Sequence, residues 1–146
     1  MADLIERGLR WGFGALWIYA GALKLADPLS FLDAVRSFQI LGDPWAAIVA
    51  LALPPLEIFC GLAVVVGRWC YGGALVLLDG ALAVFLGALL WGWHSGLDVT
   101  CGCFGREENA TDYPTKVIQN VGLLGVGGLL LGIWARRMSP GRVKRG

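Results

Sequence analysis

Four long apolar stretches alternate with short polar segments along the chain. They cover residues 9–25, 45–66, 69–93 and 117–134. Each is close to the ~20 residues that a helix needs to cross a ~30 Å hydrocarbon core. The pattern therefore predicts an all-α integral membrane protein, a single four-span domain over residues 1–146 folded as an antiparallel four-helix bundle.

The first stretch shares one feature with a secretory signal sequence, because Arg7 and Arg10 precede its apolar run. After residue 25, however, there is no small-residue cleavage site followed by a polar start, and three more apolar stretches come later. We therefore expect the first stretch to be retained as a membrane helix.

The segment between the first two stretches has a helical pattern of its own. Asp27 is suited to cap a helix whose first position is Pro28. Three apolar residues would share one face of that helix: Phe31, Val35 and Phe38. We expect a short amphipathic helix on the outer membrane surface, ended by residues 42–44.

Glycines recur within the last two stretches. Three lie seven residues apart, at positions 73, 80 and 87, and four more stand at positions 122, 125, 128 and 132. A seven-residue spacing places glycines on one helix face, where a neighbouring helix can approach closely. We expect these glycines to be packing surfaces of a compact bundle, and the same pattern is compatible with a homo-oligomer.

Composition agrees with the membrane class and charge adds an orientation. Of the 146 residues, 57% are hydrophobic and 16% charged, and the net charge of +1 gives no reason to expect nucleic acid as a partner. Eight of the twelve Lys and Arg residues lie near the chain ends or in the turn between the second and third stretches. Positive residues favour the cytoplasmic side. We therefore expect a multi-pass protein of the bacterial cytoplasmic (inner) membrane, with both termini cytoplasmic and the loop after residue 93 extracytoplasmic.

Two carboxylic acids, Glu57 and Asp79, lie inside apolar stretches, where a charge costs at least ~2.5 kcal/mol on insertion scales. Each is eleven residues from the middle of the turn that joins the second and third stretches, so both reach the same depth. This predicts that they approach each other and share a proton. In the alternative, each of the two carboxylic acids separately forms hydrogen bonds across the bundle with backbone groups that Pro54 and Pro55 leave without a helical partner. Lys24 is a third partner or, alternatively, extends to the interface.

The four cysteines fall into two groups. Cys60 and Cys70 have apolar neighbours and are expected to act as small hydrophobic residues. Cys101 and Cys103 stand in a polar loop, separated by a glycine that lets the two sulfurs meet. A disulfide across so small a ring is strained, and strained exposed disulfides exchange readily. The loop therefore favours thiol–disulfide exchange.

Two other interpretations of the loop remain open. His94, Cys101 and Cys103 together offer three ligands for a soft metal ion. The two cysteines can also form a purely structural disulfide.

Several segments together resemble the MauE family of redox-associated membrane proteins, which are related to DoxX. They are "AGALKLADPLSF" at residues 20–31, "LPPLEIFCGL" at 53–62, "CGCFG" at 101–105 and the polar pair Gln119-Asn120. Members of the family often have Arg-Asn in place of Gln119-Asn120.

This resemblance implies a four-helix membrane protein that works beside extracytoplasmic thioredoxin-like proteins and supports the maturation of extracytoplasmic proteins. It also implies that Cys101 and Cys103 are the working pair, with Lys24, Asp27 and Glu57 near the site. Analogy with quinone-linked disulfide generators suggests a membrane quinone as cofactor.

The sequence thus predicts a membrane thiol–disulfide oxidoreductase. Cys101 and Cys103 would carry the exchange, and Glu57, Asp79 and Lys24 would handle the accompanying protons. One alternative is soft-metal binding or transport through the outer cysteines and the intramembrane carboxylates. Another is a non-catalytic membrane assembly factor.

Overall fold

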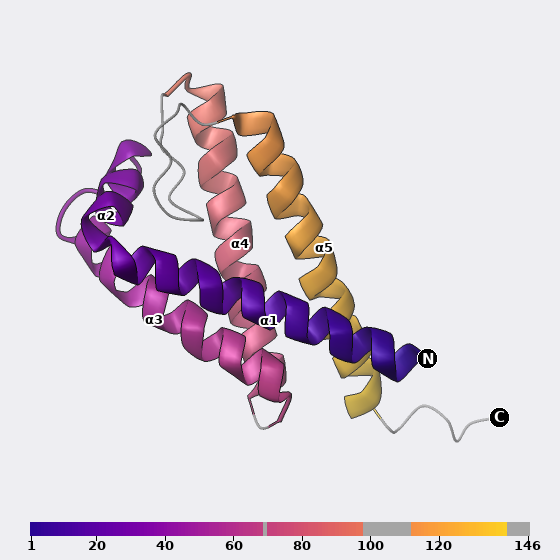
Figure 1. Cartoon of the computed structure of the whole chain (residues 1–146). Coiled ribbons are helices and arrows are strands. Elements are labelled where there is room, and N and C mark those ends of the chain that lie inside the picture. The colour runs from indigo at the N-terminus through magenta and orange to yellow at the C-terminus, as the bar shows by residue number, and fades with distance from the viewer. Residues whose placement is uncertain (69, 98–111, 140–146) are drawn as a thin grey trace.

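The computed structural model describes residues 1–68, 70–97 and 112–139, and all regular structure in these ranges is helical. The helices are α1 (Ala2–Ala26), α2 (Pro28–Ser37), α3 (Trp45–Val66), α4 (Tyr71–His94) and α5 (Tyr113–Met138), as Figure 1 shows. The predicted all-α class is confirmed.

Three of the described helices, α3, α4 and α5, are long and apolar enough to cross a membrane. In α1, Arg10 and Lys24 interrupt the apolar run, and this helix does not meet the same criterion. The expected stretch 45–66 coincides with α3, whereas α1 and α5 extend beyond the stretches expected for them. The described residues therefore contain three candidate membrane spans, while a fourth crossing by α1 stays a prediction.

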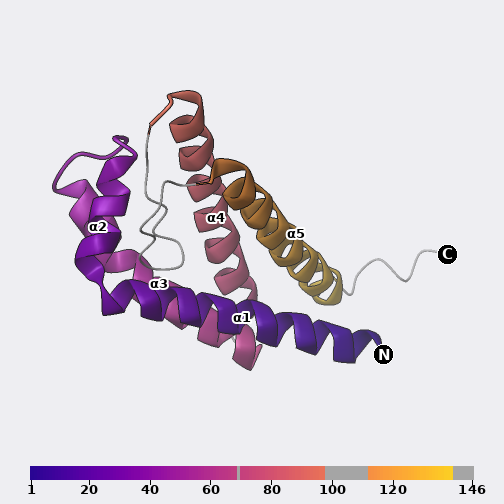
Figure 2. The ribbon, with the colours of Figure 1, turned by 45° about the horizontal axis from the view of Figure 1, so that its top comes forward.

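The four long helices are arranged as two pairs. α1 lies along α3, and α4 lies along α5, whereas α3 and α4 contact each other much less although they follow each other in the chain. Figures 1 and 2 show the two pairs diverging toward the end that carries α2. The molecule is therefore narrow where its N-terminus lies and wide where α2 lies.

Glycines bring the α1–α3 pair into backbone contact. A Cβ at Gly14 would lie 2.7 Å from the carbonyl oxygen of Gly61, and a Cβ at Gly61 would lie 2.8 Å from that of Gly14. Farther along the same seam, a Cβ at Gly21 would lie 2.8 Å from the carbonyl oxygen of Pro54. No larger residue fits these places unless the helices separate.

The glycines expected to pack are not the ones that do. Among the described residues, no neighbouring side chain or helix comes within 4 Å of a Cβ built at positions 73, 80, 87, 122, 125, 128 or 132. The spacing identified a helix face correctly, but α4 turns part of that face toward a cavity. In the α4–α5 region the close contacts are instead made by Gly72, which lies under the Trp134 ring, and by Gly127.

The short helix α2 begins as predicted. Asp27 accepts hydrogen bonds from the Ser30 backbone N–H (3.1 Å) and from the Ser30 hydroxyl (2.7 Å), and Pro28 takes the first helical position. The expected apolar face packs inward, since Phe31 and Phe38 are buried. The helix ends at Ser37, which is earlier than the expected stop at residues 42–44.

Ion pairs hold the narrow end together. The Arg137 guanidinium at the end of α5 donates to Asp3 (3.0 Å) and Glu6 (2.5 Å) at the start of α1. We call these contacts the terminal clasp. Nearby, Arg10 donates to two carbonyl oxygens in the last turn of α3, those of Val64 (3.1 Å) and Val65 (3.0 Å).

Candidate functional site

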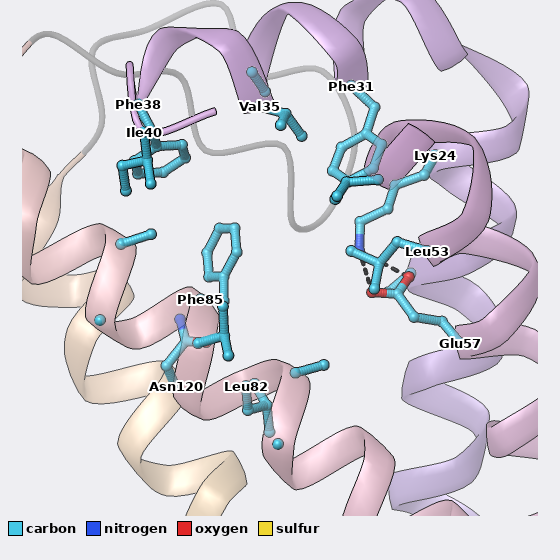
Figure 3. Close-up of a pocket in the computed structure, with 18 of the residues that line it drawn as sticks. Lys24, Phe31, Val35, Phe38, Ile40, Leu53, Glu57, Leu82, Phe85 and Asn120 are labelled. Carbon is cyan, nitrogen blue, oxygen red and sulfur yellow. Dashed lines mark hydrogen bonds and ion pairs between the residues drawn. The ribbon is translucent and has the colours of Figure 1, made fainter. Parts of the chain in front are cut away.

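A buried ion pair joins α1 to α3 in the wide half of the molecule. The Lys24 ammonium donates to both carboxylate oxygens of Glu57, at 2.6 and 2.8 Å. The two side chains are only 5% and 3% exposed. The ring of Phe31 in α2 covers the ammonium at 5.1 Å from the ring centroid, so three helices enclose the pair. Figure 3 shows the Lys24 side chain directed at the Glu57 carboxylate.

The glycine seam sets the position of this pair. Gly21 lies one turn before Lys24, and a Cβ placed there would lie 3.4 Å from the Cβ of Glu57. The absence of a side chain at Gly21 lets α3 come close enough for Glu57 to contact Lys24. The pair is therefore held by the contact of two helix backbones.

A large cavity opens beside the ion pair, between the two helix pairs. Its volume is about 1050 Å³ and its lining is mostly apolar. Lys24 and Glu57 lie in its wall, and Asn120 of α5 lies across from them (Figure 3). Gly80 and Gly87 line it on α4, so the open glycine face of that helix is part of the cavity wall. Asn120 is 3% exposed and donates from Nδ2 to the backbone carbonyl of Lys116 at 2.8 Å.

The expected meeting of Glu57 with Asp79 does not occur. Glu57 faces α1, while the Asp79 carboxyl lies against α5, in the space that a Cβ at Gly127 would take. The Asp79 Oδ1 atom is buried and has no hydrogen-bond partner among the described residues. Equal depth in the membrane did not bring the two carboxyl groups into contact, because α3 packs on α1 and α4 packs on α5. Lys24 is likewise buried rather than extended to the interface.

The two described cysteines differ from each other. Cys60 is 6% exposed and belongs to the hydrophobic core with Phe13 and Val64, as expected. Cys70 is exposed at the N-cap of α4, and its role as a small hydrophobic residue stays a prediction. Both carry free thiols.

The segment with Cys101 and Cys103 lies outside the described residues, but both of its flanks are described. The Tyr113 hydroxyl donates to the carbonyl oxygen of Leu97, and the Trp93 and Tyr113 rings stack with centroids 6.1 Å apart. The two ends of the segment are therefore fixed beside each other at the wide end.

The suggested metal set, His94 with Cys101 and Cys103, is described only in part. His94 is exposed at the end of α4. Within the described ranges no group of three or more His, Cys, Asp or Glu residues is placed to hold a metal ion. A site that includes the two outer cysteines stays a prediction.

A protein-family model described as "Methylamine utilisation protein MauE" matches residues 2–135. The chain belongs to the MauE family. Comparisons with curated proteins and with solved structures gave no match. In this MauE family member the matched region contains the Lys24–Glu57 pair, Asn120, and the pair Cys101 and Cys103. The resemblance seen in the sequence is thus confirmed at the level of the family.

Sequence reasoning on this MauE family member missed the cavity and the glycines that position its polar wall. Gly14 and Gly21 lie seven residues apart in α1, and that spacing was a signal of the seam. The cavity itself left only an ambiguous signal, since an open glycine face and a packed one have the same spacing.

Proposed function

We propose that this MauE family member is a membrane-embedded thiol–disulfide redox protein. The Cys101–Cys103 loop exchanges disulfides or electrons with an extracytoplasmic thioredoxin-like partner and so supports the maturation of extracytoplasmic proteins. The observation that carries the proposal is the "CGCFG" motif in a polar loop of an otherwise apolar chain of this family.

We further propose four membrane crossings in the bacterial cytoplasmic membrane, with both termini in the cytoplasm. The terminal clasp supports this, because it joins the start of α1 to the end of α5 at one end of the molecule. The flanks of the cysteine loop lie at the other end, where α2 also lies (Figure 1). Arg10 and Lys24 of α1 both bond internal acceptors, which lowers the cost of placing this helix in lipid.

The exchange follows the chemistry of dithiols. The thiolate of one loop cysteine attacks the disulfide of the partner, a mixed disulfide forms, and one partner thiolate leaves. The second loop cysteine then attacks the mixed disulfide, which leaves a Cys101–Cys103 disulfide and a reduced partner. Two electrons pass to the partner, and its two thiols take up the two protons that the loop thiols release. The reverse sequence reduces the loop.

We assign proton handling within the membrane to the Lys24–Glu57 pair. An ammonium and a carboxylate in direct contact can exchange a proton without leaving an isolated charge in the apolar interior. Asp79 is a separate carboxyl on the far helix pair, and the packing described above gives it no direct link to that pair.

The exchange is tested with single serine variants of the loop. Both Cys101→Ser and Cys103→Ser are made, because the sequence does not say which cysteine attacks. In the variant that lacks the resolving thiol, the attacking thiol should be trapped in a covalent adduct with a thioredoxin-like protein. Cys70→Ser is the matched control, because it also removes an exposed free thiol. It should leave trapping by the loop variants unchanged. If neither loop variant yields an adduct and both lose a thiolate-bound metal that the wild type retains, the protein handles metal instead. If full activity survives without either cysteine, it is an assembly factor.

The topology is tested with the same thiols. Cys70 lies at the start of α4, and the loop lies beyond its end, so the two report on opposite ends of one helix. In intact spheroplasts a membrane-impermeant maleimide should label a variant with Cys101 as its single cysteine. A variant with Cys70 as its single cysteine should be labelled only after the membrane is opened. The opposite labelling pattern would refute the orientation.

A further inference from the structure

We propose that the cavity between the two helix pairs binds a lipid-soluble quinone and its quinol, with the head group against the Lys24–Glu57 pair. A volume of about 1050 Å³ is slightly larger than the usual range of small-molecule sites, ~300–1,000 Å³. The lining is mostly apolar, and the charged and amide side chains among its described residues are those of Lys24, Gln39, Glu57 and Asn120. Such a lining suits a ligand with an apolar body and a small polar head.

The shape of the cavity comes from specific residues on each side. On α4, Gly80 and Gly87 contribute no side chain, which leaves room beside the helix. At the wide end, Phe38, which follows the last residue of α2, meets Phe85 of α4 edge to face, with ring centroids 5.8 Å apart. Figure 3 shows Phe31, Phe38 and Phe85 around the cavity. Aromatic walls favour a flat ring as the bound body.

The ion pair determines which head group fits. A lysine ammonium has three hydrogens, and within the described part of the chain Lys24 donates to two acceptors, both on Glu57. The third hydrogen can therefore serve a carbonyl oxygen of a ligand. A carboxylate has lone pairs beyond the two that Lys24 uses, so Glu57 can accept from a ligand hydroxyl. A quinone supplies the carbonyl, and its quinol supplies the hydroxyl.

Charge excludes an anionic lipid as the preferred ligand. Lys24 and Glu57 neutralise each other at 2.6 Å, and both are buried. An added carboxylate or phosphate would bring a third charge with no counter-ion into an apolar site, which is strongly unfavourable. A neutral head group carries no such cost.

The choice of a quinone among neutral lipids rests on the proposed function. Oxidation of a dithiol releases two electrons and two protons, and the reduction of a quinone to its quinol takes up the same number. The cavity itself is inferred from described residues alone and does not depend on the cysteines.

Binding is tested on the full-length protein in nanodiscs, with a short-chain ubiquinone as the probe. Trp17 and Trp91 line the cavity, so bound quinone should quench tryptophan fluorescence in a saturable manner. Gly80→Leu fills the cavity and should weaken binding at least tenfold. Gly73→Leu is the matched control, since Gly73 is exposed one heptad earlier on the same helix and does not line the cavity. It should bind like the wild type.

The head-group contact is tested with the double variant Lys24→Met plus Glu57→Leu, which leaves no unpaired charge. One lost hydrogen bond of ~0.5–1.5 kcal/mol corresponds to a roughly two- to tenfold loss of quinone affinity. Oleate and monoolein serve as competitors with an anionic and a neutral head. Quinone should bind more tightly than both.

Three results would overturn the proposal: no saturable quenching by quinone, equal quenching in Gly80→Leu, or tighter binding of oleate or monoolein. The Cys101→Ser plus Cys103→Ser variant separates this inference from the proposed function. It should bind quinone as the wild type does. Quinone binding without any trapped adduct would support the cavity proposal and contradict thiol exchange. A trapped adduct without quinone binding would support thiol exchange and contradict the cavity proposal.

Discussion

Lys24→Met should destabilise the protein more than any other single charge removal in the described part of the chain. The substitution keeps most of the side-chain length but leaves the Glu57 carboxylate 3% exposed and without its cation. Removal of one partner from a buried ion pair costs about 3–5 kcal/mol. The folded variant can avoid a buried, unpaired charge if Glu57 is protonated. A glutamate in the unfolded chain has a pKa of about 4.3, so this protonation costs about 3.7 kcal/mol at pH 7. The two estimates agree.

The cost of protonating Glu57 also makes the stability deficit of Lys24→Met depend on pH. Protonation of Glu57 becomes easier by about 1.36 kcal/mol for each pH unit below 7, so the deficit of the variant should shrink to about 1 kcal/mol at pH 5. The assay is reversible unfolding in mixed micelles as the SDS fraction rises, followed by far-UV circular dichroism at both pH values. Lys24→Met plus Glu57→Leu should recover most of the loss, because an apolar pair of similar volume is often as stable as the ion pair it replaces.

Arg36→Met is the matched control for this experiment. Arg36 pairs with Asp43 at 2.8 Å, but the two side chains are 44% and 56% exposed. Loss of such a surface pair costs about 0.2–1 kcal/mol. A deficit for Lys24→Met as small as that of Arg36→Met, or one that does not change between pH 7 and pH 5, would refute the reasoning about a buried pair.

Three further predictions concern packing and capping. Gly61→Ala should cost about 1–3 kcal/mol by forcing the α1–α3 seam apart, whereas Gly122→Ala, in open space, should not destabilise in the same unfolding assay. Gly127→Ala should be similarly destabilising because its methyl group takes the place of the Asp79 carboxyl, and Asp79→Ala in the same chain should restore most of the stability; a double variant as weak as the single one would argue against this contact. Asp27→Ala should cost ~1 kcal/mol and speed amide exchange at the start of α2, and unchanged exchange there would show that the cap contributes little.

The elements of this fold were predictable because each depends on a local pattern. The run 45–66 is apolar except for Glu57, and it forms α3 with the same bounds. The Asp27-Pro28 pair sets the start of α2 through a cap and a fixed φ, both of which act within one turn.

The partners of the helices were not predictable in the same way. Glu57 and Asp79 were placed at the right depth, but depth does not say which neighbour a helix faces. That choice was decided by Gly14, Gly21 and Gly61, whose backbone contacts hold α3 on α1 rather than on α4. The ion pair follows from that choice.

The cavity depends on the angle between two helix pairs, and no local pattern encodes that angle. Gly80 and Gly87 show the limit clearly, since the same spacing marks a tight interface in one protein and an open wall in another. Of the candidate site, the sequence therefore predicted that Lys24 and Glu57 matter, but not that they face a common space.

The terminal clasp has a consequence for biogenesis. A chain that leaves the ribosome N-terminus first completes α1 and α3 well before α4 and α5, so the first helix pair can assemble while the second is still being made. Arg137 is among the last helical residues to be synthesised, so Asp3 and Glu6 have no Arg137 to pair with until α5 has been made. The clasp can therefore close only after the other four helices have been made, and it joins the first turn of α1 to the last turn of α5. Without α5, the carboxylates of Asp3 and Glu6 would lack the Arg137 guanidinium, so the first turn of α1 would keep an uncompensated negative charge.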